Sequence, residues 1–192
     1  AYCRKFDPDV VVVMHAINDL YRSFSPPRFA IGKYESGYSH FYGPSINGAK
    51  PESFFQFLYN NFRKIWFGKI LKPRDFKINE FVSLMDFENY LSQLVELIQQ
   101  DGAKPILVSQ GYLYQENMDI LTQNTLWMDR TLCEKNNTFP NSRSHAKAMD
   151  AYNLITKEIT ENYQIQFIPA EKYLPKNLDY FVDDVHYTTE GS

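Results

Sequence analysis

The chain has 192 residues, of which 44% are hydrophobic and 22% charged, and its formal net charge is -3 at pH 7. This composition is typical of a globular domain, and the length favours one domain over two. A slightly acidic chain without a dense lysine and arginine stretch argues against a nucleic-acid-binding protein. No apolar run reaches the length of a membrane-spanning helix and no signal peptide is recognisable, so the sequence leaves localisation open.

The sequence contains no pattern for a metal or cofactor. Its two cysteines, Cys3 and Cys133, are too few for a disulfide framework and are not spaced as metal ligands with the four histidines. Two free thiols are the favoured interpretation. There is also no glycine-rich phosphate loop and no His-Glu-x-x-His motif, so we expect neither a metal nor a cofactor.

The first predicted element is a strand at residues 9–14. It contains four consecutive valines with no polar alternation, which is typical of a strand buried on both faces of a parallel sheet. Ligand sites in such sheets lie beyond the carboxyl ends of the strands. Asn18 comes shortly after this strand and is therefore expected at that edge.

Residues 15–50 are rich in glycine, proline, serine and tyrosine and predict a long loop. Because such a loop is uncommon in a compact domain and leaves the sheet at its carboxyl edge, we interpret it as a wall or lid of a substrate pocket. Residues 51–71 then carry aromatic and aliphatic side chains at helical spacing. Packing of these aromatics on the core is favoured over an interfacial segment for lipid substrates.

A helix that Asp86 can cap, ending at Asp101-Gly102, precedes a second buried strand at 104–109. The stretch 111–140 is ambiguous, with one helix expected around 120–133. Its aromatic side chains have two open interpretations, lining a pocket or packing in the core, and include Tyr112, Tyr114 and Trp127.

A helix at 144–162 and a strand at 165–168 form the last helix–strand unit. Helix followed by strand across a short turn is the pattern of a parallel crossover. The chain therefore predicts an α/β fold with a mainly parallel sheet, of which three strands from about five are present.

Two short motifs at opposite ends of the chain carry the chemistry. Ala16-Ile17-Asn18-Asp19 follows the first strand, and Asp183-Asp184-Val185-His186 lies beyond the last. The Asp-x-x-His spacing places a carboxylate and an imidazole one helical turn apart, so that the carboxylate can hold one ring nitrogen while the other faces a nucleophile. The two motifs together, in this order on an α/β chain, resemble those of the SGNH (GDSL-type) hydrolase family.

The resemblance implies a three-layer α/β/α sandwich of flavodoxin-like type and assigns a role to each matching residue. Asn18 would donate its side-chain amide to the oxyanion, His186 would be the general base and Asp183 would orient it. Ala16 stands where the family pattern has glycine, which is tolerable if its φ is negative.

Two blocks of the family pattern are missing, namely the Gly-Asp-Ser nucleophile and a glycine that completes the oxyanion hole. Only fifteen residues precede Ala16, too few for two strands and a crossover helix. We therefore expect residues 1–192 to be a single SGNH-hydrolase-like domain, truncated at the N-terminus and also at the C-terminus, where 188–191 resembles the start of a helix. Alone, this piece is expected to be inactive and to aggregate or stay partly unfolded.

Two residues within the chain are weaker alternatives for these roles. Ser109 ends the second strand and is a second candidate nucleophile, although it lacks a Gly-x-Ser-x-Gly elbow. Asp184 is a second candidate orienter of His186. Asp19 and Asp184 are otherwise expected to stabilise turns.

The function that the resemblance implies is serine-dependent ester hydrolysis through an acyl-enzyme. A lipid, a carbohydrate ester or another small ester is the expected substrate. Two alternatives stay open, an acyltransferase on the same scaffold and a binding domain that lacks the serine. A rate that depends on an alcohol acceptor would distinguish the acyltransferase from the hydrolase. The absence of an upstream serine would favour the binding domain.

Overall fold

The structure, a computed structural model, describes residues 6–22, 72–126 and 138–192. Residues 23–50 of the predicted lid, the predicted helix at 51–71, both cysteines and Trp127 lie outside the described residues. So does the second half of the helix expected at 120–133. The described part nevertheless contains both sequence motifs.

The described residues form an α/β fold around a parallel sheet. Its strands are β1 (Val10–Met14), β3 (Lys104–Val108) and β5 (Gln166–Ile168), in the order β1-β3-β5. Both pairings are parallel, with Met14 beside Val108 and Val108 beside Ile168. The three strands predicted from the sequence are thus confirmed, and their carboxyl ends meet at one edge.

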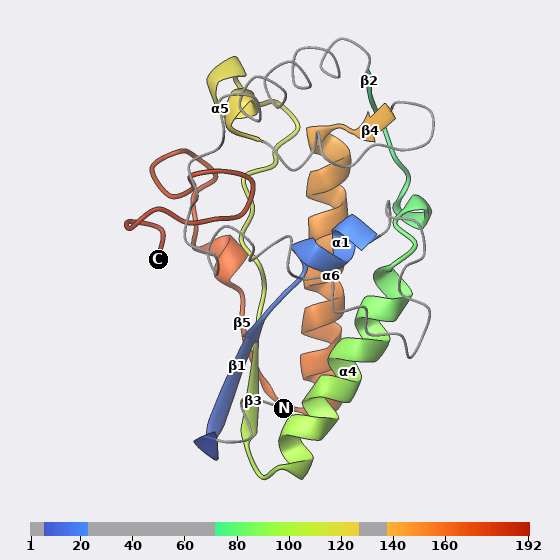
Figure 1. The fold of residues 1–192 in the computed structure, drawn as a ribbon, viewed down its shortest axis with the longest axis vertical. Coiled ribbons are helices and arrows are strands. Elements are labelled where there is room, and N and C mark those ends of the chain that lie inside the picture. Colours follow the sequence, from blue (N-terminus) through green and yellow to red (C-terminus); the bar gives the residue numbers. More distant parts are fainter. Residues whose placement is uncertain (1–5, 23–71, 127–137) are drawn as a thin grey trace, which may run out of the picture.

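Two long helices pack against each other and against the sheet, α4 (Leu84–Gln100) and α6 (Ser142–Tyr163). Figure 1 shows them side by side on the same side of the three strands. The apolar face of α4 is buried at every third or fourth position, at Phe87, Leu91, Val95 and Ile98. The Phe87 ring meets Tyr152 of α6 edge-on at 4.8 Å between centroids.

The ends of these helices follow from local chemistry. Asn141 begins α6 by accepting a hydrogen bond from the Ser144 amide at 2.9 Å. The helix ends at Gln164, which has a left-handed backbone with φ of 53°. For α4 the expectation was wrong by one turn, because Ser83 occupies the cap position and Asp86 lies inside the first turn, where a carboxylate suits the helix dipole.

Among the described residues, helices cover one face of the sheet only. On the covered face Leu107 is fully buried, whereas on the other face the exposed fractions of Val10, Val12 and Met14 are 45%, 60% and 44%. The prediction that the first strand is buried on both faces was therefore wrong for the described part of the molecule. A run of valines indicates that a strand is suited to burial, but it does not indicate whether a second layer of helices covers its other face.

Several short elements were not predicted. The expected loop at 15–50 begins with a helix, α1 (Ile17–Arg22). Strands β2 (Lys72–Arg74) and β4 (Thr138–Pro140) form a separate parallel pair. Two 3-10 turns, η2 (Ile78–Glu80) and η4 (Ala170–Lys172), were also not predicted. Helix α5 (Ile120–Thr125), in contrast, forms the first part of the helix expected at 120–133. Residues 188–191 form turns rather than the start of a helix. No helix in the described ranges is long and apolar enough to cross a membrane.

Candidate active site

The Asp-x-x-His motif forms a tight turn rather than a helical turn. Asp183 Oδ1 accepts hydrogen bonds from the backbone amides of Val185 and His186, each at 3.0 Å. This arrangement is an aspartate turn, in which the side chain replaces a backbone acceptor. The sequence correctly paired Asp183 with His186, but the backbone that joins them is a turn.

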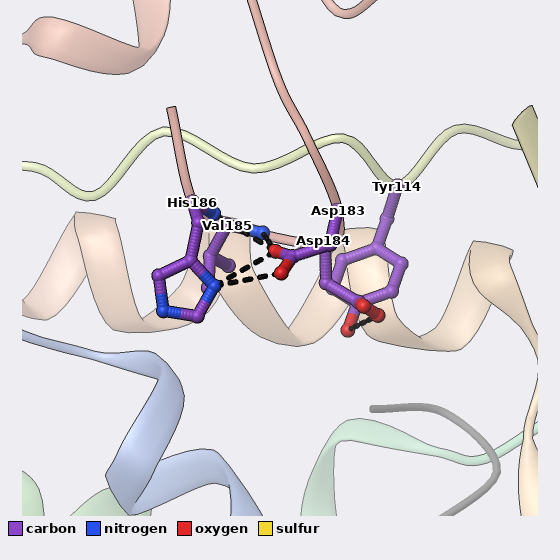
Figure 2. A network of polar contacts seen from close by, with 5 residues as sticks. All are labelled: Tyr114, Asp183, Asp184, Val185 and His186. Carbon is purple, nitrogen blue, oxygen red and sulfur yellow. Dashed lines mark hydrogen bonds and ion pairs between the residues drawn. The ribbon is translucent and has the colours of Figure 1, made fainter. Parts of the chain in front are cut away.

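The same carboxylate holds the imidazole of His186. The Nδ1 atom of His186 lies 2.9 Å from Asp183 Oδ1 and 2.8 Å from Oδ2. Because an ionised carboxylate only accepts hydrogen bonds, Nδ1 carries the proton and Nε2 is left with its lone pair. Figure 2 shows Nε2 on the edge of the ring that points away from Asp183. The His186 side chain is 62% exposed and that of Asp183 only 16%, so the imidazole is accessible and the carboxylate that holds it is shielded.

Long-range contacts hold this turn over the carboxyl edge of the sheet. The Tyr187 hydroxyl accepts a hydrogen bond from the Gly111 amide at 3.1 Å and lies 3.7 Å from the sulfur of Met14. A Cβ atom at Gly111 would come within 3.0 Å of the Tyr187 hydroxyl oxygen and 2.8 Å of Leu174 Cδ1, so glycine permits this close approach. His186 therefore lies next to the residue that connects its turn to the ends of β1 and β3.

Asn18 is the second residue of α1, directly after β1, and is half-buried. The helix is fixed there because the Ile17 amide donates to Gln110 Oε1 at 2.8 Å, and Gln110 follows β3. Asn18 makes no side-chain hydrogen bond to another described residue, which leaves its amide available. Ala16 is fully buried and is not among the described residues with positive φ. Alanine in place of glycine therefore leaves the backbone unstrained at this position.

A second histidine–carboxylate pair lies within the same segment. His15 Nε2 is 2.5 Å from Asp19 Oδ2, one helical turn further along the chain. The backbone oxygen of Asp19 also accepts a hydrogen bond from Ser83 at 2.5 Å. The pair occupies the Nε2 atom of His15, and the hydrogen bond from Ser83 ties α1 to the start of α4.

Ser109 is not placed as a nucleophile. Its side chain is fully buried and its hydroxyl is hydrogen-bonded to the Glu171 carboxylate and to the backbone oxygen of Ile168. No serine hydroxyl in the described residues hydrogen-bonds to the ring of His186. The weaker candidate from the sequence therefore has a structural role at the end of β3.

Asp184 does not orient His186 either. It is fully buried and accepts a hydrogen bond from the Tyr114 hydroxyl at 2.6 Å, on the side of the turn opposite to His186 (Figure 2). Tyr112 and Tyr114 are buried in the core, so packing is the correct interpretation of these two residues. Sequence reasoning missed the Tyr114–Asp184 contact, and its one signal was a second aspartate inside the motif that had no assigned partner.

Burial shifts the pKa of several groups near this turn. Desolvation lowers the pKa of His145 on α6 to about 4, so this imidazole is neutral at pH 7. Burial, followed by a hydrogen bond to Asp150, raises the pKa of Tyr112 well above its usual range. Burial also raises the pKa of Tyr187. These groups keep fixed protonation states near neutrality and serve as scaffold.

In the described ranges no three histidine, cysteine, aspartate or glutamate side chains are grouped as metal ligands. The arrangement that is present, a carboxylate-bound imidazole with an accessible Nε2 at the carboxyl edge of the sheet, suits proton transfer in acyl chemistry.

Comparison with known proteins agrees with this chemistry. The model of the GDSL-like lipase/acylhydrolase family matches residues 3–192, so the chain belongs to this family. Its fold is accordingly the α/β three-layer sandwich, with the parallel sheet described above, and its class is that of ester hydrolases. The comparison with curated proteins gives no match.

Proposed function

We propose that this protein is a serine-dependent acyl hydrolase in which His186 is the general base, Asp183 its orienter and Asn18 an oxyanion donor. The observation that carries the proposal is the contact between Asp183 and Nδ1 of His186, which leaves Nε2 accessible. An imidazole held in this tautomer accepts the proton of an attacking hydroxyl and returns it to the leaving alcohol.

The mechanism divides into two acyl transfers. A serine oxygen attacks the ester carbonyl while Nε2 of His186 takes its proton, and Asp183 stabilises the imidazolium that forms. The amide of Asn18 donates a hydrogen bond to the oxyanion, a contribution worth about 3 kcal/mol in the transition state. Water then attacks the acyl-serine with His186 again as base, and a small-molecule or lipid acid is released.

The serine is proposed to lie upstream of Ala1, on a strand beside β1. Two observations support this placement. In the described residues the outer edge of β1 pairs with no other strand, and the sheet face that carries Val12 and Met14 is exposed. Parallel sheets are normally covered on both faces, and exposed edges promote aggregation. Residues 1–192 alone are therefore proposed to be an inactive, truncated part of one domain that aggregates in isolation.

A fluorophosphonate probe tests the serine directly. The natural full-length protein should be labelled at one serine, which peptide mass spectrometry would place before Ala1, and residues 1–192 alone should not be labelled. Labelling of a serine within 1–192 would refute the upstream placement. Absence of labelling in the full-length protein would refute the catalytic proposal and favour a binding domain, whereas turnover only with an added alcohol acceptor would favour an acyltransferase.

The variant Asn18→Ala tests the oxyanion role in the full-length protein. It should lower kcat by about 100- to 1000-fold with little change in KM, because the lost hydrogen bond is made in the transition state. Asn162→Ala is the matched control, since Asn162 is exposed near the end of α6 distant from the carboxyl edge. An Asn18 variant as active as this control would remove Asn18 from the mechanism.

A further inference from the structure

The turn that carries Asp183 and His186 contains a buried residue, Asp184, between the two. Asp184 points inward and is fully buried, while its neighbour Asp183 points to the imidazole (Figure 2). Adjacent side chains thus project to opposite sides of the turn. Any rotation of the backbone at Asp184 would move both at once.

Two hydrogen bonds attach Asp184 to the segment that follows β3. The Leu113 amide donates to the backbone oxygen of Asp184 at 2.9 Å, and the Tyr114 hydroxyl donates to Asp184 Oδ1 at 2.6 Å. One contact fixes the main chain and the other fixes the side chain, so the residue is held at two points. A buried carboxylate without such a donor would cost several kcal/mol, which makes the inward position depend on its partners.

Tyr114 is itself held rigidly. It is fully buried, and its ring stacks on the imidazole of His145 with centroids 4.6 Å apart and an angle of 16° between the planes. His145 belongs to the first turn of α6, whose amino end Asn141 caps. Packing against α6 therefore positions the Tyr114 hydroxyl. Through its hydrogen bond to Asp184, this hydroxyl in turn positions the exposed turn.

We propose that Tyr114 and Asp184 are positioning residues, whose hydrogen bond sets the orientation of the Asp183–His186 pair relative to the substrate. This inference rests on the proposed function for its kinetic part. Neither residue touches the reacting atoms in this role. Each acts through the backbone of the turn, because only Val185 separates Asp184 from the base.

The variant Tyr114→Phe removes the hydroxyl and keeps the ring that stacks on His145. In the natural full-length protein it should lower kcat by about 10- to 100-fold with little change in KM, as expected when a reacting group is displaced by about 1 Å or less. Tyr112→Phe is the matched control, because it removes a buried tyrosine hydroxyl from the same segment at a different carboxylate, Asp150. The control should keep its kcat.

A double-variant cycle separates positioning from general destabilisation. When Asp183→Ala has already released the imidazole, Tyr114→Phe should lower kcat no further, because the orientation that it protects is lost. A persistent loss in the Asp183→Ala background would show that Tyr114 acts only on the stability of the fold. Asp184→Asn keeps an oxygen acceptor for the Tyr114 hydroxyl and should retain more activity than Asp184→Ala, which provides a second comparison if Tyr114→Phe folds poorly.

A measurement without turnover keeps the inference independent of the proposed function. The Nδ1 proton of His186, shared with Asp183, should give a downfield NMR resonance, assigned by its absence in His186→Gln. Tyr114→Phe should broaden or abolish this resonance, and Tyr112→Phe should leave it in place. If both hydroxyl deletions leave it unchanged, or change it equally, the positioning role is refuted even where the protein hydrolyses esters. If the natural protein hydrolyses no ester but the resonance responds to Tyr114 alone, the proposed catalysis fails and the positioning contact stands.

Discussion

The part of the chain that the structure describes contains two exposed histidines paired with carboxylates, and they differ in how their surroundings hold them. His15 and Asp19 are joined through Nε2 across one turn at the start of a helix. His186 and Asp183 are joined through Nδ1 in an aspartate turn that is secured from β3 and its following segment. The side chains of the first pair belong to one short segment, which Ser83 and Gln110 contact only at the backbone, whereas the turn of the second pair is held through its side chains as well. Both histidines lie close to a carboxylate, so the proposed role of His186 rests on its accessible Nε2 and on the contacts that hold its turn.

The largest expected effect separates the two roles of Asp183. Asp183→Asn retains an oxygen for the backbone amides, but it offers the imidazole an amide that favours the wrong tautomer. We expect kcat of the full-length enzyme to fall by about 10⁴-fold while the circular dichroism spectrum and thermal midpoint change little. A fall of less than tenfold would show that Asp183 is not the orienter.

The buried histidine provides a second, pH-dependent test. The folded pKa of His145 is about 4, below the ordinary value of 6.5, because burial disfavours its charged form. Between these values the unfolded chain binds more protons, so the free energy of unfolding should decrease as the pH falls from 6.5 towards 4, by up to about 1.4 kcal/mol per pH unit.

Urea unfolding of the full-length protein at pH 7 and pH 5 would measure this dependence. His145→Phe, which keeps a ring against Tyr114, should reduce the difference between the two pH values by about 2 kcal/mol. If His145→Phe has the same difference in unfolding free energy between pH 7 and pH 5 as the natural protein, His145 does not cause the loss of stability in acid.

A smaller effect on kcat is expected at the contact between Gly111 and Tyr187, which holds the turn from the segment after β3. Gly111→Ala would place a methyl group against the Tyr187 hydroxyl and displace it, so kcat should fall by about tenfold. Gly102→Ala makes a useful contrast, since Gly102 has φ of +84° and no atom within 4 Å of an added Cβ. That variant should lose about 1 kcal/mol of stability with kcat unchanged. Equal kinetic losses in the two variants would argue against support through Tyr187.

The smallest effect is expected at the locally held pair. Asp19→Asn should cost a few tenths of a kcal/mol and change kcat less than about twofold, because an i,i+4 pair at a partly exposed position contributes little. Glu161→Gln is a matched control, since Glu161 pairs with Lys157 at 3.2 Å on α6 with the same spacing. A large kinetic loss confined to Asp19→Asn would bring the His15 pair into the active site.

The sequence predicted the elements that carry a strong repeating pattern. The strands β1, β3 and β5 and the helices α4 and α6 were each found close to their observed bounds, because burial of one face imposes the pattern. The β2–β4 pair was missed since each strand has three residues and contains a proline, Pro73 or Pro140. Exposure of Val12 was also missed, because a strand's own residues do not reveal whether a second layer covers them.

The candidate site was predictable to the extent that it is local. Asp183 and His186 were paired correctly because they are three positions apart in one motif. Asn18 was expected at the carboxyl edge, and the structure places it directly after β1. The Tyr114–Asp184 contact joins residues 70 positions apart, and its one signal in the sequence, the second aspartate of the motif, does not indicate which residue it contacts.

The aspartate turn also has a genetic consequence. Codons for aspartate and asparagine differ by one base, and asparagine forms the same kind of turn. In the mechanism proposed above, one transition at position 183 would therefore keep the shape of the turn and remove most of the hydrolytic rate. The mutational distance between the active and the nearly inactive form of the protein is then a single nucleotide.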